Sequence, residues 1–146
     1  MTRTEVRALF KSAVDLLSPA VQFNSGRISE FTSQANKSYP FVWLEPLQVS
    51  TEFTTIQSPI DSWECVAHIA KQDKMDSLPV QYEAIVDECD LIAQKLIHNL
   101  NQVVSGYKLI TISGVTREPF IKKISDATSG VIISFTLISD DKTNVC

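Results

Sequence analysis

The sequence predicts an α+β domain: an antiparallel β-sheet with a short N-terminal helix and one long helix packed on one face, forming a two-layer sandwich. Three observations support this prediction. Residues 80–106 repeat apolar side chains at helical spacing for about seven turns. Residues 3–17 do so for about four turns. The segments 39–73 and 107–139 contain β-branched and aromatic runs with short connections, which favour antiparallel neighbours.

The first helix is predicted from TRTEVRALFKSAVDLLSP at residues 2–19. Thr2 and Glu5 have the spacing of a capping box, and Pro19 is expected to stop the helix. One face of this helix is charged, so it is expected to pack by the other face, which carries Val6, Leu9, Phe10, Ala13, Val14 and Leu17.

A long polar loop is predicted at residues 19–38, PAVQFNSGRISEFTSQANKS, because no period is sustained there. Three apolar side chains, Phe23, Ile28 and Phe31, interrupt this loop. They either anchor the loop on the core of the same chain or contact a partner chain, and both interpretations remain open.

Three strands of an antiparallel meander are predicted next, at residues 39–49, 51–58 and 62–73. Pro40 and Pro46 make the first of them an edge strand or a bent one, since proline has no N–H to donate. In the third strand, SWECVAHIAKQD, alternation predicts one apolar face with Trp63, Cys65, Ala67 and Ile69.

The long helix is expected to begin after Pro79 and to end at Gly106 as a C-terminal cap. Its length of roughly 36–39 Å is enough to cover the whole face of a sheet. Its predicted apolar stripe consists of Tyr82, Ile85, Val86, Cys89, Ile92, Leu96, Leu100 and Val103.

Two or three strands follow the long helix. The strand at residues 107–113 is expected to break at Gly114. The strand at residues 116–125 contains Pro119, so it is predicted to be an edge strand or a bulged one.

The chain is expected to close with a turn at residues 126–130, a strand at 131–139 and a flexible polar tail at 140–146. A length of 146 residues fits one hydrophobic core, so residues 1–146 are predicted to form a single domain. The inward face of the last strand would carry Val131, Ile133, Phe135 and Leu137.

Composition limits the class of function. The chain has 44% hydrophobic residues and a formal net charge of −4, which is typical of a soluble globular protein and argues against a nucleic-acid-coating surface. The local basic group of Arg117, Lys122 and Lys123 has the pattern of a solvated edge strand. Three scattered cysteines, no signal peptide and no membrane-spanning run together predict a soluble intracellular protein.

No reactive constellation can be assembled from the sequence. Cys65 and His68 would point to opposite faces of a strand, and Cys89 and His98 to opposite sides of a helix, so neither pair has the spacing of a metal site. Neither histidine has the local context of a catalytic motif, and no glycine-rich loop could bind phosphate. The sequence therefore predicts no catalytic residue, no cofactor and no metal ion, and thus a protein that is not an enzyme.

Three stretches stand out in this order of elements: YPFVWLEPL entering the sheet, SWECVAHIAKQD as the strand before the long helix, and YEAIVDECDLIAQKLI in that helix. With the order of the elements, they resemble the tail terminator and tail-completion proteins of tailed bacteriophages. The ending, TSGVIISFTLISDDKTNVC, resembles the last hairpin strand and polar end of phage neck and tail-joining proteins. The resemblance covers nearly the full chain, by pattern rather than by a signature residue.

The resemblance implies a structural virion protein, assembled in the host bacterial cytoplasm, that forms a hexameric or dodecameric ring. Such a ring lies at the head-tail (neck) junction or at the tail end, where it contacts portal, neck or tail tube proteins and stops tube growth. DNA would only pass through its lumen, where net acidity repels phosphate, and no membrane is involved. The regions that correspond to the family's contacts are residues 19–38, 39–58 and 116–139.

The interface candidates are Phe23, Ile28, Phe31, Trp43, Phe53, Arg117 and Phe120. The two tryptophans, Trp43 and Trp63, are either interface anchors or core residues. Two other functions remain open. One is a small cytosolic α+β ligand-binding domain or enzyme subunit, whose pocket between helix and sheet would contain His68 or His98. The other is a dimeric adaptor unrelated to viruses.

Overall fold

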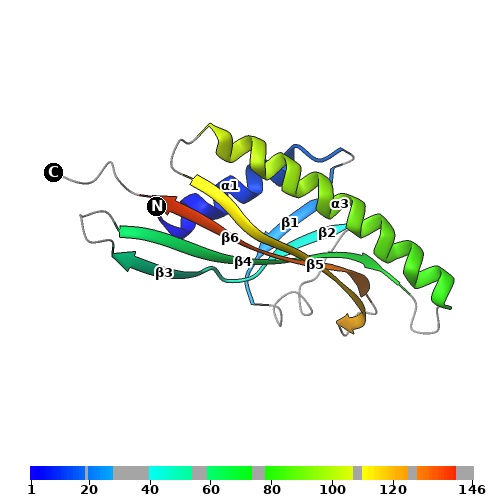
Figure 1. The fold of residues 1–146 in the computed structure, drawn as a ribbon. Coiled ribbons are helices and arrows are strands. Elements are labelled where there is room, and N and C mark those ends of the chain that lie inside the picture. Colours follow the sequence, from blue (N-terminus) through cyan, green and yellow to red (C-terminus); the bar gives the residue numbers. More distant parts are fainter. Residues whose placement is uncertain are drawn as a thin grey trace.

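The α+β prediction is confirmed: in the part of the chain that the structure describes, two helices pack on one face of a six-stranded, mostly antiparallel sheet (Figure 1). The computed structural model describes residues 1–18, 20–27, 40–53, 59–73, 78–106, 110–124 and 128–140, and only the backbone of 122–124 and 140. The strand order is β1-β2-β4-β6-β5, with β3 beside β4. The elements are α1 (Arg3–Asp15), β1 (Gln22–Ser25), β2 (Phe41–Leu44), β3 (Gln48–Phe53), β4 (Pro59–Gln72), α3 (Pro79–Ser105), β5 (Ile110–Ile124) and β6 (Thr128–Asp140).

Helix α1 begins with the predicted capping box. The Glu5 N–H donates to the Thr2 hydroxyl oxygen at 3.2 Å, and the Thr2 N–H donates to Oε2 of Glu5 at 2.6 Å. These bonds satisfy two N–H groups that a helix start leaves without intrahelical partners. The helix ends at Asp15 with Leu16 as its C-cap, earlier than the predicted stop at Pro19, which itself lies outside the described residues. The predicted apolar face is buried.

Strand β1 corrects the prediction that residues 19–38 form a loop throughout. It pairs with β2 in parallel, so the sheet is not purely antiparallel. A parallel pair needs a long connection, and residues 26–40 between the two strands supply it. Phe23 of β1 packs on the core, with its ring centroid 5.7 Å from that of Phe10. Residues 28–39 lie outside the described ranges.

The predicted three-stranded meander is also wrong in its pairing. Strands β2 and β3 do not pair with each other but lie end to end along β4, where Leu44 faces Ala67 and Gln48 faces Glu64. The segment between β2 and β3 contains Pro46, which has no backbone N–H to donate to a neighbouring strand. Strand β4 has 14 residues and is therefore long enough to pair with both.

Helix α3 confirms the long helix, with Pro79 in its first turn. Gly106 is the C-cap residue as predicted, but its φ of −73° is right-handed, so the helix ends without a left-handed turn. The fully buried positions are Cys89, Ala93, Leu96, Leu100 and Val104. The first turns lie outside this stripe, where Val80 is 78% exposed.

Strand β5 corrects the prediction that Gly114 breaks the chain into two strands. Gly114 has a φ of +64°, a conformation that glycine adopts without strain, and the register shifts between Ser113 and Thr116. The extra residue is absorbed as a β-bulge, so the strand continues to Ile124. The expected edge position is confirmed, since β5 lies at the end of the strand order.

Strand β6 begins earlier than predicted, so the turn expected at 126–130 does not extend to Gly130; residues 125–127 lie outside the described ranges. A Cβ at Gly130 would collide with the carbonyl oxygen of Ile69 on β4, so this position needs glycine for close approach.

The sheet has an apolar cluster on each side. The main core lies under the helices and contains the predicted inward faces of β4 and β6. The second cluster lies on the other side of the sheet, and sequence reasoning missed it. It consists of Phe41, Trp43, Ala70 and Phe120, with Ile132 packed against it.

Candidate functional site

The candidate contact surface is the end of the sheet that contains β3. There the described strands run in the order β3, β4, β6, β5, and the side away from the helices is uncovered by α1 and α3 (Figure 1). We name this surface the open face. Its residues alternate along each strand with those of the main core, so they lie on the side of the sheet away from the helices. Its members are Gln48, Ser50, Glu52, Ser62, Glu64, Thr111, Ser113, Thr136 and Ile138.

Strand β3 is one edge of this surface and is unprotected. Within the described part of the chain it pairs with β4 alone. It contains no proline, lysine or bulge, which are the features that normally prevent an edge from pairing with another chain. Phe53, an interface candidate, stands at its end with 80% of its surface exposed.

Strand β5 is the opposite edge, and its two halves differ. Residues 110–113 pair regularly with β6 and carry no charge. The half beyond the bulge carries Arg117, Glu118 and Pro119, which hinder the addition of another strand. Nη1 of Arg117 donates to Oδ2 of Asp90 on α3 at 3.2 Å, so this interface candidate is engaged within its own chain.

Two other interface candidates, Trp43 and Phe120, are buried, each with 2% of its surface exposed. The Trp43 Nε1–H donates to the Gly26 carbonyl oxygen at 2.8 Å, and Phe120 lies edge-on to His68. Neither side chain is therefore available at the surface of the single chain. The run FVWL at 41–44 was a signal for this, because four consecutive apolar residues favour a strand buried on both faces.

The loop candidates have different outcomes. Phe23 is half-buried and packs on the core of its own chain, as the first of its two interpretations predicts. Ile28 and Phe31 lie outside the described residues.

Among the described residues, the histidines and cysteines do not come together. Cys65 lies in the main core, whereas His68 contacts Phe120 on the other side of the sheet, and His98 is exposed on α3. Burial raises the pKa of both the Cys65 and Cys89 thiols to about 12, so both remain protonated. Within the described ranges, no group of three or more His, Cys, Asp or Glu side chains could hold a metal ion.

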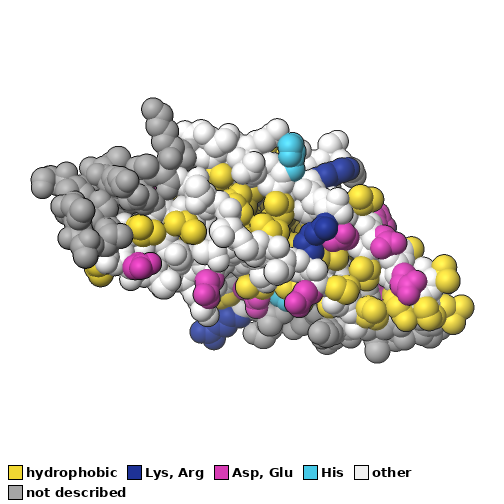
Figure 2. Space-filling view, viewed as in Figure 1, with side chains coloured by type: hydrophobic (Ala, Val, Ile, Leu, Met, Phe, Trp, Pro, Cys, Tyr) yellow, Lys and Arg dark blue, Asp and Glu magenta, His cyan; other side chains and the backbone are white. Residues whose placement is uncertain are grey.

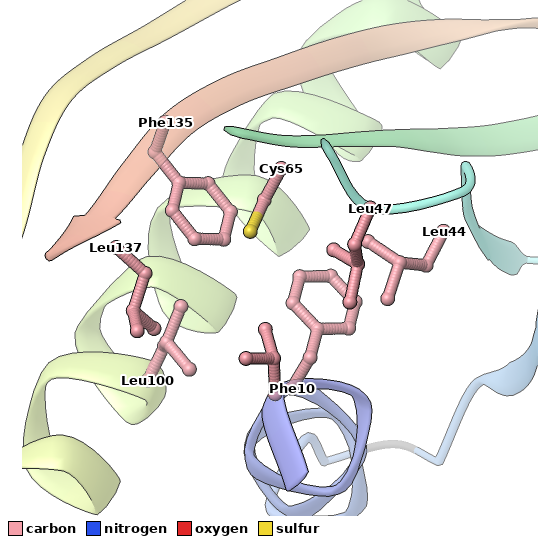
Figure 3. A pocket seen from close by; sticks show the side chains of 8 residues that line it. Phe10, Leu44, Leu47, Cys65, Leu100, Phe135 and Leu137 are labelled. Carbon is pink, nitrogen blue, oxygen red and sulfur yellow. The ribbon is translucent and has the colours of Figure 1, made fainter. Parts of the chain in front are cut away.

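Where α1, α3 and the described strands meet, the interior is filled by side chains. Figure 3 shows these side chains converging from α1, α3 and the strands. The free volume left among them is about 0 Å³. A ligand has no space there, and neither histidine lines it. The lining residues are Val6, Phe10, Leu44, Leu47, Cys65, Leu100, Phe135 and Leu137.

A shallow groove of about 200 Å³ lies between the end of α1, the approach to β1 and the outer side of α3. Its volume is below the roughly 300–1,000 Å³ of typical ligand pockets. Figure 2 shows further apolar side chains gathered at the start of α3, where Leu78 and Val80 are exposed. The groove is lined by Leu17, Ser18, Val21, Pro40, Glu88, Leu91, Ile92 and Lys95.

The sequence matches no model of a known protein family and no curated protein. Neither described helix is long and apolar enough to cross a membrane.

Proposed function

We propose that the protein is a structural virion protein of the tail terminator type, which forms a ring at the neck or at the tail end of a tailed bacteriophage. The ring is a hexamer or dodecamer assembled in the host bacterial cytoplasm. It contacts neighbouring portal, neck or tail tube proteins, and DNA only passes through its lumen.

The observation that carries this proposal is the sheet with two open edges at one end. Strand β3 and residues 110–113 of β5 each present backbone groups that no described strand pairs with. A long helix supports the sheet from one side, and ion pairs join it to two strands. Nζ of Lys71 lies 2.6 Å from Oε2 of Glu88, and Arg117 pairs with Asp90. Two open edges on one sheet suit a contact that repeats from one subunit to the next.

The charge of the open face is consistent with a ring through which DNA slides. Glu52 and Glu64 are its charged members, and both are exposed. A carboxylate-bearing face repels phosphate, whereas clustered lysine and arginine would retain it.

The absolute mass of the purified protein tests the proposal, measured by native mass spectrometry and light scattering across a concentration series. We expect a closed oligomer of about six or twelve copies of the 16.3 kDa chain, in equilibrium with monomer at low concentration. A chain that stays monomeric at every concentration, or stops at a dimer, would contradict it.

A small ligand-binding domain is the second candidate, and the groove beside α3 is the observation that favours it. Thermal stabilisation by a metabolite tests this function, because a ligand that binds the folded state raises the melting temperature. Loss of that shift in a Leu91→Asp variant would assign the binding to the groove.

A further inference from the structure

The two open edges lie in one row of the sheet. Ser50 of β3 faces Ser62, Ser62 faces Ile138, and Ile138 faces Thr111 of β5. Each of these neighbours is antiparallel to the next, so β3 and β5 run in opposite directions at opposite edges of the same end (Figure 1).

We propose that β3 of one copy pairs with residues 110–113 of β5 in the next copy, in the antiparallel sense. A second copy placed beside the first in the same orientation brings its β5 edge to the first copy's β3 edge, with opposite strand directions. The same step can then repeat, because each copy uses one edge and leaves the other open. Such a head-to-tail contact closes into a ring when the rotation between copies fits. This inference rests on the proposed ring function and names the edges that build it.

The side chains of the two edges are compatible. Residues 110–113 carry no charge, and Glu52 is the single charged residue of β3, so no like charges oppose the pairing. On the helix side of the sheet, Val49, Trp63, Leu137 and Ile112 form one row. With a neighbour's Ile112 beside Val49, its β5 would extend this apolar layer as far as Thr51, next to Phe53, which is 80% exposed in the single chain.

The other half of β5 does not offer an equivalent edge. The bulge at Gly114 twists the strand, and Pro119 has no N–H to donate. Pairing between the β3 strands of two copies would make a two-fold dimer and leave both β5 edges open, so a second, different contact would be needed to close a ring.

A cross-link between the two edges tests the proposal. Ser50→Cys and Thr111→Cys are combined in a Cys146→Ser background, where the remaining thiols Cys65 and Cys89 are buried. Both new thiols lie on exposed positions of the open face. After treatment with a short bismaleimide, we expect a ladder of covalent oligomers up to the full ring on a denaturing gel. Each single-cysteine variant is the matched control and should remain monomeric.

The outcomes separate this inference from the proposed function. A ring by native mass without cross-linking in the double variant would overturn the β3–β5 pairing and leave the ring proposal intact. Dimers from the Ser50→Cys variant alone would show β3–β3 pairing and overturn the inference. A monomer at every concentration would overturn both proposals.

A second pair of variants serves if the cysteine variants fold poorly. Phe53→Lys places a charge next to the end of the neighbour's strand, so we expect the ring to be lost to monomer. Val80→Lys is the control, because Val80 is equally apolar and 78% exposed but lies at the start of α3. A Phe53→Lys protein that assembles as wild type does would contradict the pairing.

Discussion

Nε2 of His68 lies 3.3 Å from Oε2 of Glu45, on the side of the sheet opposite the two helices. His68 also contacts the edge of Phe120 and faces Trp43 across the β2–β4 pair. The contact joins the segment after β2 to the middle of β4. It places a titratable group beside the second apolar cluster.

The first prediction concerns the pH dependence of stability. Burial lowers the pKa of His68 below its ordinary value of 6.5, and the Glu45 carboxylate only partly opposes this. The unfolded chain therefore binds more protons at His68 than the folded chain does. The contribution of neutral His68 to the free energy of unfolding is complete above about pH 6.5, and it is lost as the pH falls through the lower pKa of the folded state. Urea denaturation at pH values above and below about 6.5 should show this loss of unfolding free energy.

A His68→Gln variant should have a weaker pH dependence in this window. His98→Gln, at the exposed histidine of α3, is the matched control for the substitution itself. An unchanged pH profile in His68→Gln would show that His68 does not titrate differently on folding.

The second prediction compares the unfolding free energy that is lost when each of two glycines is replaced by alanine. Gly114→Ala should cost about 1–2 kcal/mol of unfolding free energy, because alanine is strained at a φ of +64° although no atom lies near its Cβ. Gly130→Ala should cost more, since its Cβ meets the backbone of β4. Chemical denaturation of the two variants measures the difference, and equal costs would contradict the close approach at Gly130.

The third prediction compares the unfolding free energy that is lost when a leucine on each side of α3 is replaced by alanine. Leu100 is 1% exposed in the main core, so Leu100→Ala should lower the unfolding free energy by about 2–5 kcal/mol. Leu91 on the outer side is 57% exposed, and Leu91→Ala should change it by less than about 0.5 kcal/mol. Urea titrations of both variants test this, and a large cost at Leu91 would mean that something covers it.

The fourth prediction concerns Arg117. Its ion pair with Asp90 is partly exposed, so Arg117→Ala should cost less than about 1 kcal/mol. The native mass should stay unchanged, because the side chain is engaged with α3 of its own chain. Loss of the oligomer in this variant would assign Arg117 to a subunit contact instead. A double-mutant cycle with Asp90→Ala isolates the pair energy.

Local patterns were sufficient to predict α1, α3, β4 and β6. The capping box of Thr2 and Glu5 and the period of α3 act between residues a few positions apart, so they can be recognised in the sequence. The alternation that buries one side of β4 is similarly local. These elements determine the α+β class and the main core.

Tertiary structure decided the pairing of the strands and the fate of the candidate residues. Pairing joins residues that are distant in sequence, as where Ile60 faces Asp140, so no local signal shows that β2 and β3 share β4 or that β1 joins in parallel. Trp43 and Phe120 are large aromatic residues, and this residue type made them interface candidates. Side chains from several strands pack around them and bury them. Phe53 remains at the surface because its strand lies at an edge, and edge position is a property of the whole sheet.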